Sequence, residues 1–187
     1  MYQSKFLINR QKIFNPCDIR AALSSYFAHL SQHQRDSFFY RLEWYKIGVV
    51  IPLIVYSKGR PEMKIMPECQ LLETGRLSEL PADTKTLGFS IFAVPPFLSA
   101  TASSIDEKQV TEWLQNELSG AAVICDSTFG PNNCIYFEKD GNECQQQTVT
   151  IKGNITITDL RQLEAIRCTP LGQAVELGCG LLHLQEN

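Results

Sequence analysis

Hydrophobic and polar residues alternate along several short stretches of the chain, and they recur at helical spacing along three others. In the first half, apolar residues from Ile19 to Leu30 fall at i, i+3, i+4, i+7, i+8 and i+11. This spacing predicts an amphipathic helix, and Asp18 can serve its N-terminus. Strand patterns surround the helix at 4–9, 37–44, 49–56 and, more weakly, 63–72. The first half therefore predicts the order β-α-β-β-β, without a second helix.

The segment 78–85 contains Pro81 and few apolar residues, which is typical of a linker. The second half begins with a strand pattern, and Ser104 with Glu107 forms a capping box that predicts a helix through Leu118. A later helix follows the potential cap Asp159. Strand patterns lie at 87–94, 121–125, 134–137 and 147–157. The order β-α-β-β-α-β is that of a ferredoxin-like domain, so we expect domains at 1–80 and 86–187.

The last forty residues combine a β-branched strand that Gly153 interrupts, a helix, a loop and a closing apolar run. The loop carries Gly172, Gly178 and Gly180. Glycine accepts positive φ and a close backbone approach, and successive backbone N–H groups can then face an anion such as a phosphate. A tight turn that needs no ligand has the same pattern, so both interpretations stay open.

Composition excludes several classes of protein. The chain has 187 residues, of which 44% are hydrophobic and 20% charged, and this suits a globular protein with a buried core. No apolar run is long enough for a membrane span, and no secretory signal is visible. Seven cysteines without a CxxC pair argue against a disulfide framework and a zinc site. We expect reduced thiols, a cytoplasmic location, and neither a metal nor a cofactor.

The net charge of −3 is unevenly distributed. Residues 1–60 hold nine Lys or Arg and three Asp or Glu, whereas residues 61–187 hold eight and seventeen. A basic half on an acidic protein is compatible with an RNA-facing surface on one side and protein contacts on the other. Simple scatter of charge is the alternative.

Four stretches of the sequence are similar to one known family. The most specific is Leu177-Gly-Cys-Gly-Leu-Leu182, and the others lie at 147–159, 109–118 and 1–5. With these motifs the chain resembles the CasE family, the CRISPR repeat endoribonucleases of the Cascade complex. The resemblance implies an α+β fold of two tandem ferredoxin-like (RRM-like) domains with a C-terminal glycine-rich loop. It also implies binding of the repeat hairpin of CRISPR RNA, cutting without a metal through 2′-hydroxyl attack, and retention among other subunits of an RNA-guided effector complex.

The resemblance fails at positions that matter for catalysis. Members of the family carry a tyrosine and a histidine one turn apart on the first helix, where this chain has Cys17 and Arg20. The loop lysine of relatives corresponds to Val175, beside Glu176. The basic stretch of relatives before the second-domain helix is here Ser-Ala-Thr-Ala-Ser-Ser at 99–104. Arginine is always protonated and a very poor base, but it binds phosphate well.

Candidate site residues follow from these positions. We expect Arg20 to hold the phosphate, with His29 or His33 as the base and Tyr26 as a possible acid. Exposed polar histidines near a helix end are the alternative for the first two. Candidate RNA contacts are the basic residues and loop glycines Lys5, Arg10, Lys12, Arg35, Arg41, Lys46, Arg161, Arg167, Gly172, Gly178 and Gly180.

Three functions stay open at this point. The first is a CRISPR RNA endoribonuclease that remains on its product. The second is a hairpin-binding assembly subunit that has lost cleavage, since no base is evident near Arg20. The third is a ferredoxin-like regulatory or small-molecule-binding domain that binds no RNA.

Overall fold

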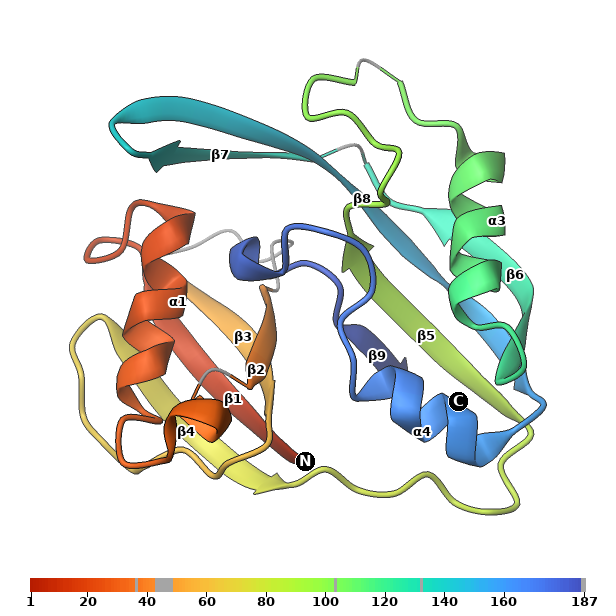
Figure 1. Ribbon diagram of the computed structural model, residues 1–187, viewed down its shortest axis with the longest axis horizontal. Coiled ribbons are helices and arrows are strands. Elements are labelled where there is room, and N and C mark those ends of the chain that lie inside the picture. Colours follow the sequence, from red (N-terminus) through yellow and green to blue (C-terminus); the bar gives the residue numbers. More distant parts are fainter. Residues whose placement is uncertain (36, 43–48, 103, 132, 186–187) are drawn as a thin grey trace. The chain divides into compact units, whose positions relative to one another are not determined.

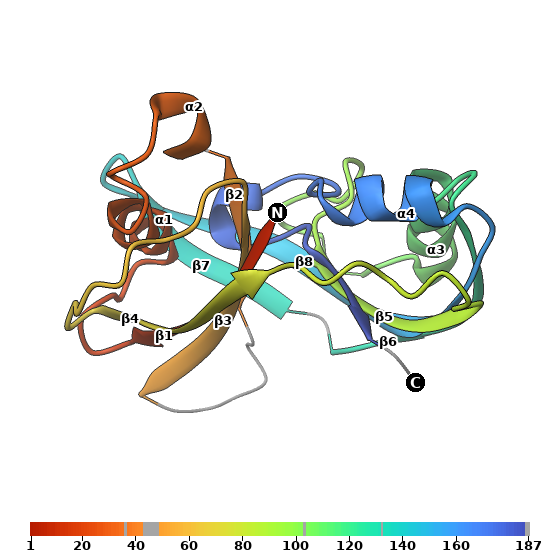
Figure 2. The same cartoon turned by 90° about the horizontal axis from the view of Figure 1, so that it is seen from below.

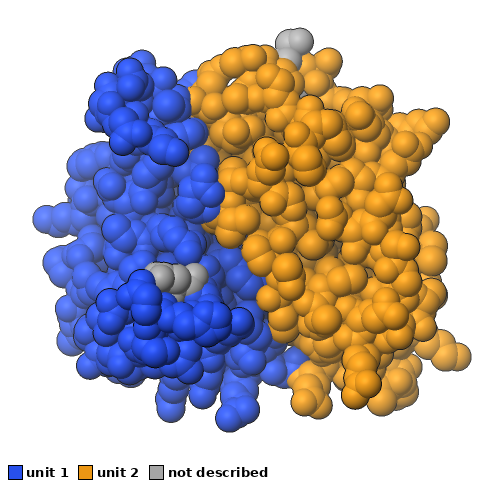
Figure 3. All heavy atoms as spheres, in the orientation of Figure 1, with its two compact units in different colours: residues 1–78, 136–144, 176–178 blue, residues 79–135, 145–175, 179–187 orange. Residues whose placement is uncertain are grey.

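The chain forms two compact units, which Figure 3 colours blue and orange. The computed structural model describes residues 1–35, 37–42, 49–102, 104–131 and 133–185. The first unit comprises 1–78, 136–144 and 176–178, and the second comprises 79–135, 145–175 and 179–187. The predicted division into 1–80 and 86–187 placed the segments 136–144 and 176–178 in the second domain, whereas they belong to the first unit.

The first unit is a four-stranded antiparallel sheet with a helix on one face (Figures 1 and 2). The strand order β2-β3-β1-β4 is that of a ferredoxin-like sheet. The segment between β3 and β4 contains no helix, as predicted. The elements are β1 (Tyr2–Asn9), α1 (Pro16–Ser25), α2 (Gln32–Arg35), β2 (Phe38–Leu42), β3 (Val50–Ser57) and β4 (Cys69–Arg76).

Helix α1 begins at a cap that the sequence pattern placed wrongly. Asn15 is the N-cap, and its side-chain oxygen accepts from the Cys17 N–H at 3.2 Å, while Pro16 occupies the first turn. Asp18 also lies in that turn, where a carboxylate favours the positive end of the helix dipole. The helix ends at Ser25 rather than near Leu30. Its buried face packs on the sheet in one hydrophobic core.

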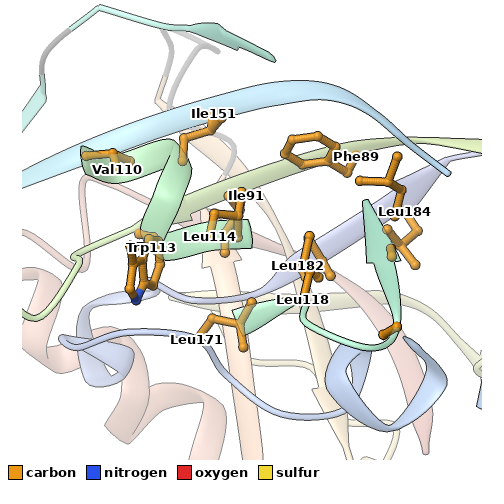
Figure 4. Packing of buried hydrophobic residues seen from close by; sticks show 14 of the residues in the cluster. Phe89, Ile91, Val110, Trp113, Leu114, Leu118, Ile151, Leu171, Leu182 and Leu184 are labelled. Atoms are coloured by element: carbon orange, nitrogen blue, oxygen red, sulfur yellow. The ribbon is translucent and has the colours of Figure 1, made fainter. Parts of the chain in front are cut away.

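The second unit repeats this topology with the strand order β6-β8-β5-β9, and β7 pairs with β8 off this path. Helices α3 and α4 lie on the same face of the sheet (Figure 2). Leu114, Ile91 and Ile151 are among the residues that fill the core between these layers (Figure 4). The elements are β5 (Thr86–Ala93), α3 (Glu107–Glu117), β6 (Ala122–Phe129), β7 (Asn133–Lys139), β8 (Asn142–Ile157), α4 (Leu160–Arg167), the 3₁₀ turn η1 (Val175–Leu177) and β9 (Leu182–Gln185). The predicted pair of ferredoxin-like folds is confirmed.

Two local predictions in the second unit need correction. Asp106, not Ser104, caps α3, since its carboxylate accepts from the N–H groups of Lys108 and Gln109. Gly153 does not interrupt its strand, because β8 runs continuously from Asn142 to Ile157. The glycine pairs with Ser127, directly after the register shift of β6, and a Cβ atom there would lie 2.0 Å from the Asp126 carbonyl oxygen. This close approach of the β6 backbone requires glycine at position 153.

Candidate functional site

The side chain of Arg20 is held against the edge strand of the first unit. Its guanidinium carbon lies 4.6 Å from the centroid of the Phe38 ring, and Nη1 donates to the Phe38 carbonyl oxygen at 3.4 Å. Phe38 in turn stacks on Phe27 at 5.0 Å between centroids. Arg20 is only half-buried, so this stack orients a charged group that solvent and a ligand can still reach.

The 3₁₀ turn η1 is fastened to the same strand. Tyr40 lies two residues after Phe38, is fully buried, and donates its hydroxyl to the Glu176 carbonyl oxygen at 2.5 Å. Gly178 packs on the Tyr40 ring, where a Cβ atom would lie 2.8 Å from Cε2, and its φ is +83°. Only glycine suits that position without displacement of the ring. The segment 176–178 is therefore fixed on β2 in the first unit.

The tip of the β7–β8 hairpin is joined to the start of α1. The Asn15 side chain donates from Nδ2 to the Glu138 carbonyl oxygen at 2.8 Å, and its Oδ1 accepts from the Glu138 N–H at 3.3 Å. Asp140 and Gly141 form the two-residue turn, both with positive φ, as a tight hairpin requires. Lys139 precedes the turn and is exposed.

The Cys17 thiol lies among these elements. Burial raises the pKa of the thiol, the carboxylates of Asp18 and Glu176 raise it further, and Lys139 acts in the opposite direction. A raised pKa keeps the thiol protonated near neutral pH, and a protonated thiol is a poor base or nucleophile. Cys17 therefore contributes no proton acceptor. Among the residues that the structure describes, no group of three His, Cys, Asp or Glu side chains is placed to hold a metal ion.

Comparison with known proteins decides the family. A family model described as "CRISPR associated protein" matches residues 1–186. The chain belongs to this family. CRISPR system Cascade subunit CasE of Escherichia coli strain K12 is 36% identical over 80 residues, which are 43% of this chain and 40% of that protein. The resemblance to CasE is thereby confirmed, although the alignment spans less than half of either protein.

Two solved structures share the fold over nearly their whole length. The crystal structure of Cas6e from E. coli K-12 has a TM-score of 0.81 and 23% identity, and the match covers 100% of both chains. Thermus thermophilus Cse3, solved with an RNA that represents a pre-cleavage complex, has a TM-score of 0.79 and 16% identity, with 98% of this chain and 99% of that chain covered. At these identities the likeness establishes the fold.

Tyr26 is not exposed as an acid that reaches a bound ligand would be. The residue is fully buried, its ring meets Phe6 edge-on, and its hydroxyl donates to the Cys69 carbonyl oxygen. Burial is the largest cause that raises its pKa to about 12. The Tyr26 hydroxyl anchors the end of α1 to β4, and its burial does not favour the predicted role as an acid.

The two candidate histidines of the first unit have other neighbours than the Phe38 ring on which Arg20 stacks. His29 is exposed, and its Nδ1 lies 3.9 Å from a carboxylate oxygen of Glu62, on the segment between β3 and β4. Arg20 contacts Phe38 of the edge strand β2. His33 is exposed on the short helix α2. A base beside Arg20 is therefore not assigned.

The basic residues predicted to bind RNA divide by exposure. Lys5 is exposed but pairs with Glu73 at 2.6 Å, and Arg35 donates to the Ala28 carbonyl oxygen at 2.8 Å. Arg41 and Arg167 are only 4% and 5% exposed, and Arg167 pairs with Glu164. Burial gives Arg41 and Arg167 a structural role and does not favour contact with RNA. Lys46 lies outside the described residues. Arg10, Lys12 and Arg161 are exposed and, with Lys5 and Arg35, stay predicted contacts.

The glycines of the C-terminal segment have structural reasons for their positions. Gly178 is buried against Tyr40, and the N–H of buried Gly180 donates to the Phe92 carbonyl oxygen at 2.7 Å. An amide that is used in this way cannot also bind a phosphate. Gly172 is half-buried and would place a Cβ atom 2.5 Å from the Val94 carbonyl oxygen. The turn interpretation therefore fits Gly178 and Gly180 better than an anion cradle does.

Three residues of the site were not predicted from the sequence: Asn15, Tyr40 and Lys139. Asn15 is joined to Glu138 across 123 residues, and Tyr40 to Glu176 across 136. Contacts between residues so far apart in the sequence leave no local pattern from which they can be predicted. Lys139 had one usable signal, because it directly precedes Asp-Gly-Asn at 140–142, a sequence typical of a turn.

Proposed function

We propose that the protein is a CasE-type endoribonuclease that binds the repeat hairpin of precursor CRISPR RNA and cuts it at the 3′ base of the stem. It then stays on the mature guide RNA as a subunit of a Cascade-like complex. The match of the family model over residues 1–186 carries this proposal. The E. coli relative is described as a Cascade subunit, and the T. thermophilus structure contains a pre-cleavage RNA. All seven cysteines are free thiols, which supports a reducing, cytoplasmic location.

Arg20 is the residue that we assign to the reacting phosphate. In the proposed reaction the upstream 2′-hydroxyl attacks the phosphorus, the bond to the 5′-oxygen breaks, and a 2′,3′-cyclic phosphate and a 5′-hydroxyl result. Negative charge develops on the phosphoryl oxygens, and a fixed guanidinium stabilises that charge by paired hydrogen bonds. The Phe38 stack and the bond to the Phe38 carbonyl oxygen hold the group before RNA arrives. Such preorganisation lowers the cost of reaching the transition state.

A second candidate function is retention of the hairpin with impaired cleavage. It is favoured by the placement of His29 beside Glu62, while Arg20 stands at the position where the CasE family has its histidine. Without an imidazole at that position, removal of the 2′-hydroxyl proton has no assigned acceptor on the protein. General base catalysis is worth about 10²–10⁴-fold in rate. Cleavage by this chain is then slower than that of relatives by a factor of this size.

One experiment tests the first proposal and separates it from the second. The purified protein is incubated with its own repeat RNA in EDTA, and binding and cleavage are followed on native and denaturing gels. A retained product with a cyclic phosphate supports the endoribonuclease. A stable shift without a cut supports the binding subunit, and in that case Arg20→His is expected to restore cleavage. If there is no shift at 50 mM salt, both proposals fail and the regulatory domain without RNA is left.

A further inference from the structure

The Asn15 side chain both caps α1 and pairs with the backbone of Glu138. As the cap of α1, its Oδ1 accepts from the Cys17 N–H at 3.2 Å. The same amide group pairs with both backbone groups of Glu138, through Nδ2 at 2.8 Å and Oδ1 at 3.3 Å. A side chain that satisfies the N–H and the C=O of one residue acts like one more residue in a β-ladder. It therefore fixes the hairpin tip in position as well as in distance.

The orientation of the hairpin tip follows from the tight turn at Asp140 and Gly141. In a two-residue hairpin, Lys139 opposes Asn142, and Cys144 lies on the same face of the ribbon as Lys139. Glu138 and Glu143 then occupy the opposite face. Asn15 at the start of α1 holds the backbone of Glu138, so Lys139 follows directly after the docked residue, and its charge acts on the Cys17 thiol of the same helix.

Arg20 and Lys139 lie on two elements that the Asn15–Glu138 pair joins. Arg20 lies three residues after Cys17 on α1, and Lys139 directly follows the residue that Asn15 holds. Asp18 and Glu176 are the opposing carboxylates near the thiol. Two cations on separate elements can bind consecutive phosphates of one strand only if the elements keep a fixed spacing. The Asn15–Glu138 pair is the contact that sets this spacing.

We propose that Asn15 is a positioning residue that docks the β7–β8 hairpin on α1, so that Lys139 and Arg20 contact neighbouring phosphates of one RNA strand. This inference rests on the proposed function, because the ligand is the same RNA. Lys139 is a binding residue in this account, and Asn15 acts through it. An amide is required at position 15, because docking needs a donor and an acceptor on one side chain.

Asn15→Asp separates capping from docking. Aspartate is as good an N-cap as asparagine, so α1 keeps its first hydrogen bonds. The carboxylate has no N–H to donate, and it faces the Glu138 carbonyl oxygen as a second acceptor. The variant should therefore fold with a melting temperature close to that of the native protein but release the hairpin tip. Lys139→Ala removes the charge and leaves the docking intact.

The test is a set of binding titrations with the repeat hairpin RNA at several salt concentrations, on the full chain. The variants are Asn15→Asp, Lys139→Ala, the double variant, and Lys58→Ala as an exposed control in the same unit. Lys139→Ala should weaken binding and reduce the salt slope by about one counterion, since each phosphate contact releases one. Asn15→Asp should weaken binding by about three- to tenfold, the size of one or two hydrogen bonds. The double variant should be no weaker than the weaker single variant.

Additive losses in the double variant would show that Lys139 does not act through Asn15, and native affinity in Asn15→Asp would show that docking is irrelevant to RNA. Either result overturns the inference. If the native protein does not bind the hairpin at all, the proposed function fails instead. If Asn15→Asp melts much earlier than the native protein, the effect of Lys139→Ala in that background decides the matter. A full Lys139 effect there contradicts the inference.

Discussion

Replacement of Arg20 by alanine is expected to weaken RNA cleavage or binding more than any other single loss of an exposed charge in the first unit. The guanidinium is stacked on Phe38 and held by its carbonyl oxygen, so it reaches the phosphate already oriented. A hydrogen bond to a charged group contributes about 1.5–3 kcal/mol. Removing it should therefore lower affinity or rate by about 10- to 150-fold, at about 1.4 kcal/mol per factor of ten.

The same substitution also removes a stabilising contact, and this must be measured separately. Loss of the stack on the Phe38 ring costs about 0.5–1 kcal/mol in free energy of unfolding. For a chain of this length, 1 kcal/mol shifts the melting temperature by about 2–4 °C. An assay at 25 °C keeps the variant folded, so a loss of activity there reflects the missing phosphate contact.

Lys58→Ala is the matched control, because Lys58 is an exposed cation of the same unit, directly after β3. It should lower affinity only through the general attraction to RNA. Arg20→Lys should give an intermediate loss, since the charge remains while the paired donors are lost. Equal effects of Arg20→Ala and Lys58→Ala on both binding and cleavage would refute the assignment of the phosphate to Arg20.

Three further predictions concern neighbouring residues. Tyr40→Phe keeps the packing on β2 but deprives the Glu176 carbonyl oxygen of its donor, so the melting temperature should fall by about 2–4 °C, measured by thermal unfolding. Glu176→Gln removes a carboxylate from the surroundings of Cys17, so RNA affinity in filter binding should rise, most clearly at low salt; an unchanged affinity would place Glu176 away from the RNA. The pKa of Tyr26 is raised from 10.0 to about 12, so its stabilising contribution is complete below pH 10 and is lost as the pH rises toward 12. Denaturant titrations should show this decline in the native protein and less of it in Tyr26→Phe, which should also keep its cleavage activity at neutral pH.

The hydrophobic pattern predicted most of the order of elements, because each ferredoxin-like unit consists of short amphipathic segments with local signals; the short helix α2 and the 3₁₀ turn η1 were not predicted. The helix from Ile19 onward and the strands at 49–56 and 87–94 are of this kind, and the structure has them as α1, β3 and β5. The helix caps were harder to predict, because several polar residues precede α1 and α3 and the folded backbone determines which of them accepts the first N–H bonds. In the structure the caps are Asn15 and Asp106.

The candidate site was harder to predict, because burial and long-range pairing decide which polar side chains face a ligand. Tyr26 and Arg41 have the right chemistry and the wrong exposure, since both are buried in the first unit. The glycines of the last loop fitted a phosphate cradle and a ligand-free turn equally well from sequence, and close packing favours the turn at Gly178 and Gly180. Arg20 was identified only because the resemblance to CasE marks its position. Its orientation over Phe38 needed the structure.

The proposed cleavage by 2′-hydroxyl attack is tested most directly with two versions of the repeat hairpin RNA. One is unmodified, and the other has a single 2′-deoxy sugar upstream of the expected cut. Both are incubated with the native protein in EDTA, and affinity and cleavage are measured on the same samples. We expect the protein to bind the two RNAs with equal affinity. It should cut the unmodified RNA to a product that ends in a 2′,3′-cyclic phosphate and leave the deoxy RNA intact. Cleavage of the deoxy RNA, or no specific binding of either RNA, would contradict the proposal.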